Sequence, residues 1–78
     1  MDNQVRSIEI DGTMYVSIKD ILSTMTNLDI NKIWSRLKRI HLVIHDMYIN
    51  YQLPGAKRTT PIANYENLMH ILKFYENL

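Results

Sequence analysis

The dipeptide Asp11-Gly12 separates two short runs in which apolar and polar residues alternate, and it constrains the fold more than any other feature of the chain. Ile8 and Ile10 alternate with polar residues before it, and a similar alternation follows over residues 13–16. Both central residues of a type I′ turn have positive φ, which Asp and Gly tolerate, and this turn matches the twist of paired strands. The sequence therefore predicts a β-hairpin with strands at about residues 5–10 and 13–16.

Three polar residues, Ser17, Asp29 and Asn64, each precede an amphipathic segment. Their side-chain oxygens can accept hydrogen bonds from the first N–H groups of a helix, and apolar pairs at staple spacing accompany all three. We predict helices that begin at these residues and end near residues 26, 40 and 77. In the last helix the predicted apolar stripe consists of Leu68, Met69, Leu72 and Tyr75.

The predicted helix over residues 30–40 has two faces of different chemistry. Its apolar residues follow the i, i+3, i+4, i+7 pattern and are Ile30, Ile33, Trp34, Leu37 and Ile40. Its polar face carries Lys32, Ser35, Arg36 and Arg39. We assign Trp34 to the core, since a tryptophan in the middle of an apolar helical face is usually buried.

Residues 42–53 are rich in β-branched and aromatic side chains, and the alternation after Met47 predicts a strand over 47–53. Pro54-Gly55 suits the centre of a type II turn, so a return strand is expected over 57–62. Pro61 lacks an N–H, which predicts that this strand lies at a sheet edge or ends there. The element order is then ββααββα in a single domain over residues 1–78, of the α+β class, with two hairpins packed against three helices.

Charge is distributed unevenly along the chain, although the formal net charge is only +1. From Asn31 to His41 there are four basic residues and no acidic one, and Lys57-Arg58 forms a second basic pair. A solvated helix face is the ordinary interpretation of such a segment. However, a face that serves solubility alone usually mixes signs, so we also consider a phosphate-binding surface.

Several classes of function lack support in the sequence. Cysteine is absent, which excludes a disulfide scaffold and a cysteine zinc site. His41 and His45 are four residues apart, but the helix is expected to end near residue 41 and no other ligand lies at suitable spacing. Both glycines are explained by turns, and a chain of 78 residues leaves little room for a pocket of about 300 Å³. We therefore expect an intracellular binding domain with no metal or cofactor, and no enzyme. The compartment would be the host nucleus or cytoplasm for a viral protein and the bacterial cytoplasm otherwise.

Three segments in succession carry a family resemblance. VRSIEIDGTMYVSIKDIL resembles the strand, Asp-Gly turn, strand and helix that open BRO-N domains. INKIWSRLKRIH is similar to the helix in which related proteins carry an aromatic residue followed by basic residues, and LPGAKRTTPIANYENLMHIL is similar to their late hairpin and final helix. The resemblance covers about residues 5–75. It implies a DNA-binding domain of a viral or phage regulatory protein, of the kind associated with antirepressors and transcription regulation.

Double-stranded DNA is the partner that this resemblance and the charge pattern predict. Its contacts would be Lys32, Arg36 and Arg39 from the helix and Lys57 and Arg58 from the tip of the second hairpin. The alternative is a small protein-interaction module that blocks or recruits a host or viral protein, or that forms a homodimer. Its predicted surface is the outward face of the 47–53 strand, led by Tyr48, because tyrosine is enriched at protein interfaces.

Overall fold

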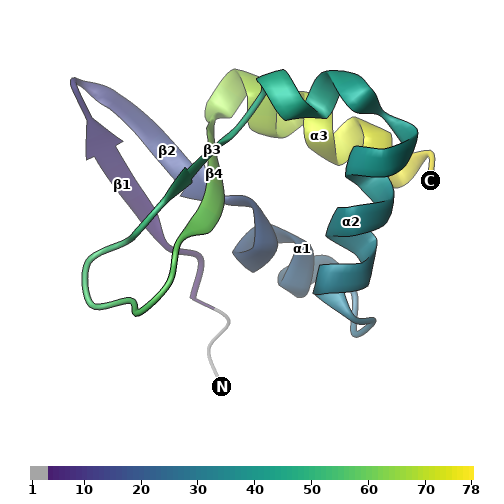
Figure 1. Cartoon of the computed structure of the whole chain (residues 1–78), viewed down its shortest axis with the longest axis horizontal. Coiled ribbons are helices and arrows are strands. Elements are labelled where there is room, and N and C mark those ends of the chain that lie inside the picture. Colours follow the sequence, from purple (N-terminus) through teal and green to yellow (C-terminus); the bar gives the residue numbers. More distant parts are fainter. Residues whose placement is uncertain (1–3) are drawn as a thin grey trace.

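The computed structural model describes residues 4–78, which form a four-stranded antiparallel sheet and three α-helices. The elements are β1 (Ser7–Ile10), β2 (Thr13–Ser17), α1 (Ile18–Met25), α2 (Ile30–Ile40), the 3₁₀ helix η1 (Leu42–Asp46), β3 (Ile49–Tyr51), β4 (Thr60–Asn64) and α3 (Tyr65–Glu76). The strands gather at one end of the molecule and the helices at the other (Figure 1). The predicted α+β class and the order ββααββα are confirmed.

The first hairpin has the predicted turn. Asp11 has φ 50° and Gly12 has φ 81°, as a type I′ turn requires, and Ile10 pairs with Thr13 across it. The hairpin projects from the rest of the domain (Figure 1). Its strands are therefore exposed along much of their length, and only the end of β2, at Val16 and Ser17, is buried.

All three predicted N-caps are confirmed. The Ser17 hydroxyl accepts a hydrogen bond from the Asp20 N–H at 3.3 Å, and Asn64 Oδ1 accepts one from the Asn67 N–H at 2.9 Å. Asp29 Oδ1 accepts from the N–H groups of Asn31 at 3.0 Å and Lys32 at 3.4 Å. These bonds satisfy N–H groups that have no partner within the helix, and so they fix where each helix begins.

The position of Pro61 differs from the prediction. The strand order is β1-β2-β4-β3, so β4 is an interior strand that continues beyond Pro61 to Asn64. Pairing with β2 extends only from Asn64 to Ile62, which lies opposite Ser17, while Pro61 pairs with Asn50 of β3. Proline is accommodated there because β2 has already given way to α1 at that level of the sheet, so no β2 residue pairs with Pro61.

The second hairpin is shorter than predicted. Residues 42–46, for which we predicted no helix, form η1, and β3 covers only Ile49–Tyr51 of the predicted 47–53 strand. The 3₁₀ geometry turns Ile44 into the core and leaves Leu42 and Val43 exposed. Burial of Ile44 thus outweighs the strand preference of this β-branched segment.

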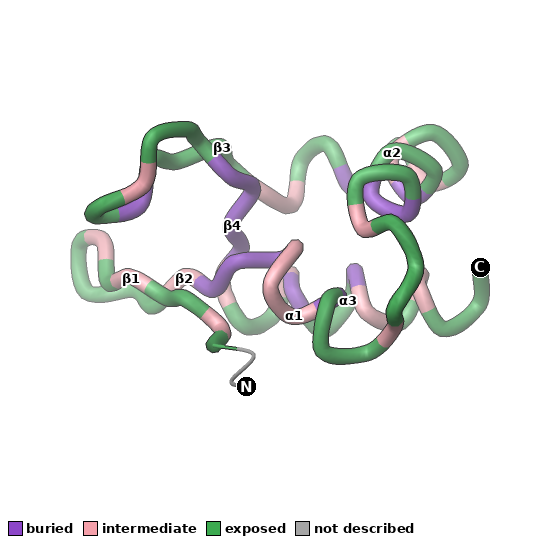
Figure 2. The backbone as a smooth tube through the Cα atoms, turned by 90° about the horizontal axis from the view of Figure 1, so that it is seen from below, coloured by how far each residue is buried: buried purple, intermediate pink, exposed green. Residues whose placement is uncertain are grey.

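The core lies between the interior strands and the helices (Figure 2). α1 and α3 pack against β4, while α2 packs mainly against α1 and η1. Each of these elements contributes at least one fully buried apolar side chain; these are Ile18, Leu22, Leu37, Ile44, Ile62 and Ile71. The stripe predicted for α3 is wrong in part, because Met69 is exposed and Ile71 is buried instead.

Candidate nucleic-acid interface

The polar face of α2 carries the cations that the sequence singled out. Lys32, Arg36 and Arg39 are exposed, whereas Ile33, Trp34 and Leu37 anchor the opposite face in the core. The first and last cations are seven positions apart, so at 1.5 Å per residue the cations form a stripe about 10 Å long. We call Lys32, Arg36 and Arg39 the cationic stripe.

Lys38 lies away from this stripe. Its Nζ is 5.4 Å from the centre of the Trp34 ring and 5.9 Å from that of Tyr48, and the two rings meet edge to face at 5.1 Å. A cation over aromatic faces is stabilised by their negative charge density. Lys38 therefore covers the aromatic edge of the core.

The cations of the stripe make no ion pair within residues 4–78. In that part of the chain the single ion pair joins Arg6 and Asp20, with Nε and Oδ2 2.8 Å apart. The carboxylate nearest to the stripe in sequence, Asp29, is engaged by the backbone N–H groups at the start of α2. The stripe thus presents positive charge that no carboxylate of the described chain neutralises.

Lys57 and Arg58 lie in the loop between β3 and β4, not in a return strand. We predicted a strand over 57–62, but β4 begins at Thr60. The loop turns at Pro54-Gly55, where Gly55 has φ 82° and the Ala56 N–H donates to the Leu53 carbonyl at 3.0 Å, as in the predicted type II turn. Leu53 is buried beneath the loop, so the turn is anchored while Lys57 and Arg58 remain exposed.

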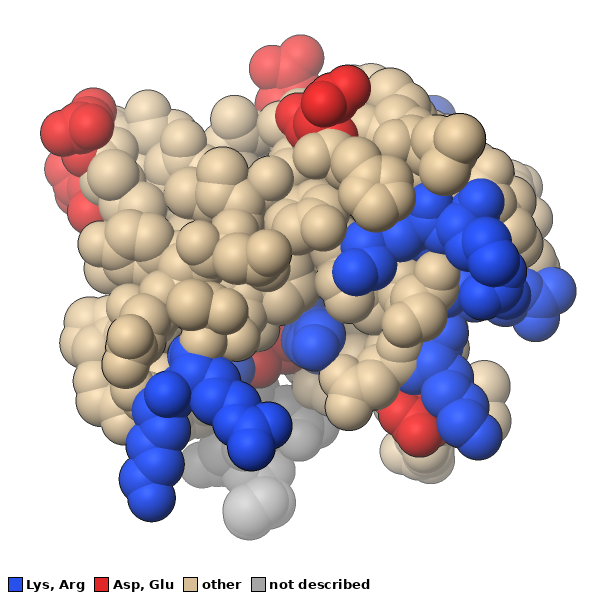
Figure 3. All heavy atoms as spheres, in the orientation of Figure 1, with Lys and Arg blue, Asp and Glu red and all other residues tan. Residues whose placement is uncertain are grey.

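The two basic segments appear on the same face of the molecule. In Figure 3, basic side chains gather over α2 on the right and over the β3–β4 loop at the lower left, and a further basic side chain lies between the two groups. Acidic side chains visible in this view lie along the upper rim, beside the basic side chains at the lower right, and partly covered near the lower centre. The principal dimensions are 30 × 30 × 19 Å, so the face that carries both segments is comparable in width with one turn of duplex DNA, about 34 Å.

Tyr48 does not lead an exposed tyrosine surface. It is half-buried, and its ring packs on Trp34 and lies 6.4 Å from the ring of His45. The exposed tyrosines are Tyr51 at the end of β3 and Tyr65 at the start of α3. The surface predicted for a protein-interaction module therefore lacks its leading residue.

The histidines form no metal cluster with the described residues. His41 stacks on Phe74, with ring centres 4.4 Å apart and planes 17° from parallel, so it joins the end of α2 to α3. No group of three or more His, Cys, Asp or Glu side chains within residues 4–78 is placed to hold a metal ion.

None of the helices within residues 4–78 combines the length and the apolar character that spanning a membrane requires.

One feature of the surface was not predicted. A groove of about 670 Å³ lies between α2 and the end of α3, which is larger than we expected for so short a chain. Its walls come from residues 28–36 and 75–78, so no local motif could have revealed it. The one sequence signal was the apolar residue Leu28 in the short connection between two predicted helices.

Comparison with known proteins adds no relative: no family model, no curated protein and no solved structure matches the chain.

Proposed function

We propose that this domain binds double-stranded DNA through the cationic stripe of α2, with the β3–β4 loop as a second contact. The observation that carries the proposal is the absence of any carboxylate partner for Lys32, Arg36 and Arg39 within residues 4–78. Phosphates would supply the missing negative charge. Such contacts provide most of the affinity of nonspecific DNA binding, with Kd of about 10⁻⁴–10⁻⁶ M at physiological salt.

The geometry favours contacts from a rigid helix. The buried Trp34 and Leu37 fix the orientation of α2, so its cations are held on one side without further ordering of the backbone. Phosphates along one strand recur at about 7 Å, so a stripe of about 10 Å can reach two of them or enter the major groove between them. Lys57 and Arg58 would then contact the backbone from the loop.

The resemblance to BRO-N domains supports the same function. It leads us to propose that the domain belongs to a viral or phage regulatory protein of the antirepressor type, acting on transcription inside a cell. It also agrees with a binding domain without catalytic activity. Sequence preference would depend on base contacts from α2, for which Arg36 and Arg39 are the candidates because arginine can donate two hydrogen bonds to guanine.

The test is a fluorescence-anisotropy titration of a random-sequence duplex at two salt concentrations. With five phosphate contacts, we expect the affinity to fall about 10²–10³-fold between about 50 and about 200 mM salt, because each contact releases a counterion from the DNA. Binding to an aromatic or apolar protein surface would lack this dependence. If no duplex binds in a salt-dependent manner, DNA binding is the wrong function for this domain.

A further inference from the structure

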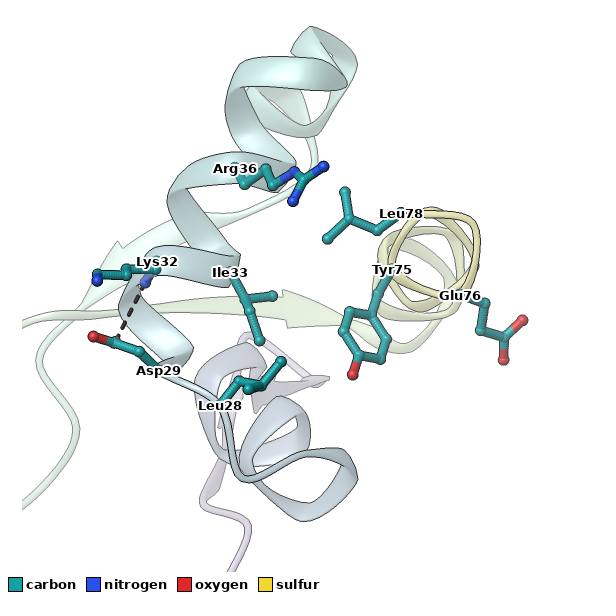
Figure 4. Close-up of a pocket in the computed structure, with 8 residues that line it drawn as sticks. All are labelled: Leu28, Asp29, Lys32, Ile33, Arg36, Tyr75, Glu76 and Leu78. Atoms are coloured by element: carbon teal, nitrogen blue, oxygen red, sulfur yellow. Dashed lines mark hydrogen bonds between the residues drawn. The ribbon is translucent and has the colours of Figure 1, made fainter.

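The groove between α2 and the end of α3 has a mixed lining, in which four apolar residues lie beside the charged residues Asp29, Lys32, Arg36 and Glu76. Leu28, Ile33, Tyr75 and Leu78 supply the apolar part. In Figure 4 the Arg36 guanidinium points toward Leu78 across the groove, and the Tyr75 ring points toward Leu28 and Ile33. A volume of about 670 Å³, lined by four apolar and four charged side chains with one guanidinium turned across it, is within the range of binding sites.

The charges around the groove favour an acidic ligand. Arg36 makes no ion pair within residues 4–78. Glu76 belongs to the lining, but its carboxylate points away from the groove (Figure 4), and Asp29 is occupied by the N–H groups that it caps. A carboxylate entering the groove would therefore meet the guanidinium without a competing acid.

Two of the four apolar residues that line the groove, Leu28 and Leu78, are exposed, whereas Ile33 and Tyr75 also pack against the core. Leu28 is 69% exposed and Leu78 is 41% exposed, although both contribute to a concave surface. Contact with phosphate and sugar would not bury these aliphatic groups, because DNA backbone contacts are polar. DNA binding thus leaves the apolar half of the groove unexplained.

A second hollow lies on the other side of Lys32 and Arg36. It has a volume of about 450 Å³ and is lined by Asn31, Lys32, Ser35, Arg36 and Arg39. Because the two hollows share Lys32 and Arg36, they form one surface that is apolar on one side and cationic on the other. A small molecule would occupy only one of the hollows, whereas an extended segment of polypeptide can use both.

We propose that this surface binds an acidic amphipathic helix of a partner protein. Its bulky apolar side chains would fill the groove beside Leu28 and Ile33, and its carboxylates would pair with Arg36 and Lys32. An amphipathic helix bound in an apolar groove is a common mode of peptide recognition, and charges at the rim select the partner. If the proposed DNA binding also holds, the partner helix and DNA compete, because both use Lys32 and Arg36.

The probe is a fluorescein-labelled synthetic helix of about four turns, with leucines four residues apart and glutamates flanking them. Two control peptides replace the glutamates by lysine or the leucines by serine. We expect the first peptide to bind and both controls to bind at least about tenfold more weakly. One control lacks the carboxylates that pair with the cations, and the other lacks the apolar side chains that fill the groove. Binding of the lysine peptide as tightly as the glutamate peptide would overturn the proposal.

Protein variants locate the site. Leu28→Ser and Arg36→Glu should each weaken binding of the glutamate peptide about tenfold or more. The matched controls are Leu42→Ser and Arg58→Glu, which change an exposed leucine and an exposed arginine outside the groove. Both should leave the affinity for the glutamate peptide unchanged. A peptide affinity that survives Leu28→Ser, or no binding at about 1 mM peptide, would contradict the proposal.

Two further measurements distinguish binding of a partner helix in the groove from binding of DNA or of a small molecule. Leu28→Ser should leave duplex affinity unchanged, whereas Arg36→Glu should lower both affinities, so loss of DNA binding and loss of peptide binding are distinguishable. Peptide binding without any duplex binding would support the groove and refute the proposed DNA function. If 4-phenylbutyrate, a small apolar carboxylate, binds as tightly as the peptide, the groove is a small-molecule site and the partner helix is excluded.

Discussion

Arg6 donates three hydrogen bonds to the carboxylate of Asp20, and so joins the residue before β1 to the first turn of α1. Two come from the guanidinium, at 2.8 Å and 3.0 Å, and one from the backbone N–H at 2.9 Å. Burial alone would raise the pKa of Asp20, but the hydrogen bonds from Arg6 and Ser17 and the Arg6 charge hold this pKa below its usual value.

The lowered pKa predicts that this contact is lost in acid. In the unfolded chain Asp titrates near pH 3.9, so the contribution of Asp20 is present above about pH 4 and disappears as pH falls through its lower folded pKa. Asp20→Asn should lower the free energy of unfolding by about 1 kcal/mol at pH 7, a modest amount because Arg6 is half exposed and solvent screens the pair. Urea titrations of both proteins should show this difference at pH 7 and a progressively smaller one as the pH falls below about 4. A difference that does not become smaller in this range would contradict the prediction.

The buried face of α2 predicts large losses of stability. Trp34 and Leu37 are 4% and 0% exposed, so Trp34→Ala and Leu37→Ala should each cost about 3–5 kcal/mol, enough to unfold most of a domain of this size. Ile40→Ala on the same helix is the control, because Ile40 is 51% exposed and should cost less than about 1 kcal/mol. Thermal melts by circular dichroism would measure all three, and equal melting temperatures would show that α2 packs by another face.

Replacing Gly12, in the turn at Asp11-Gly12, should lower the free energy of unfolding through backbone strain alone. A Cβ at Gly12 would meet no atom within 4 Å, but the φ of 81° is strained for any branched side chain. Gly12→Val should therefore destabilise the domain by about 1–2 kcal/mol, and Gly12→Asn by less, since Asn adopts positive φ more readily. Similar melting temperatures for both variants would argue against this turn.

Reversing the charges of the cationic stripe should give a folded protein that no longer binds duplex DNA. Lys32→Glu, Arg36→Glu and Arg39→Glu combined should abolish DNA binding through lost contacts and added repulsion. Folding should be largely unaffected, because exposed surface positions usually contribute within about 0.5 kcal/mol each. Single changes to Ala should each lower the salt slope, which is the slope of the logarithm of the binding constant against the logarithm of the salt concentration, by about one unit. A folded triple variant that binds like the parent would show that the DNA site lies elsewhere.

The β3–β4 loop predicts a smaller effect of the same kind. Lys57→Ala with Arg58→Ala should lower the salt slope by about two units if both residues contact phosphates. Lys73→Ala is a suitable control, because Lys73 is an exposed cation in the last turn of α3. An unchanged slope for the double variant would restrict the DNA contact to α2.

Local features of this chain could be predicted because their causes lie within a few residues. The turn at Asp11-Gly12 depends on backbone preferences, and the caps at Ser17, Asp29 and Asn64 depend on side chains that reach the next turn of their own helix. The exposure of the cationic stripe followed from the apolar residues opposite to it on α2. None of these features requires knowledge of the rest of the fold.

The errors concern residues whose environment is set by distant parts of the chain. Ile44 enters the core as part of η1, although its neighbours favour a strand, and Ile71 replaces Met69 in the core because of where α3 meets the sheet. Pro61 lies in an interior strand because β2 stops one residue short of it. The groove beside Arg36 forms only when the fold brings the end of α3 close to α2, so the spacing of its residues along the sequence carries no signal.

The interior position of β4 also determines when the domain can fold during synthesis. Residues 13–17 cannot complete their pairing until residues 60–64 have left the ribosome, because β4 lies between β2 and β3. Until then the nascent chain holds a hairpin and two helices whose apolar faces have no sheet to cover them. We therefore expect the fold to form as one cooperative step only after β4 has left the ribosome, at a rate set by closing the long connection between β2 and β4.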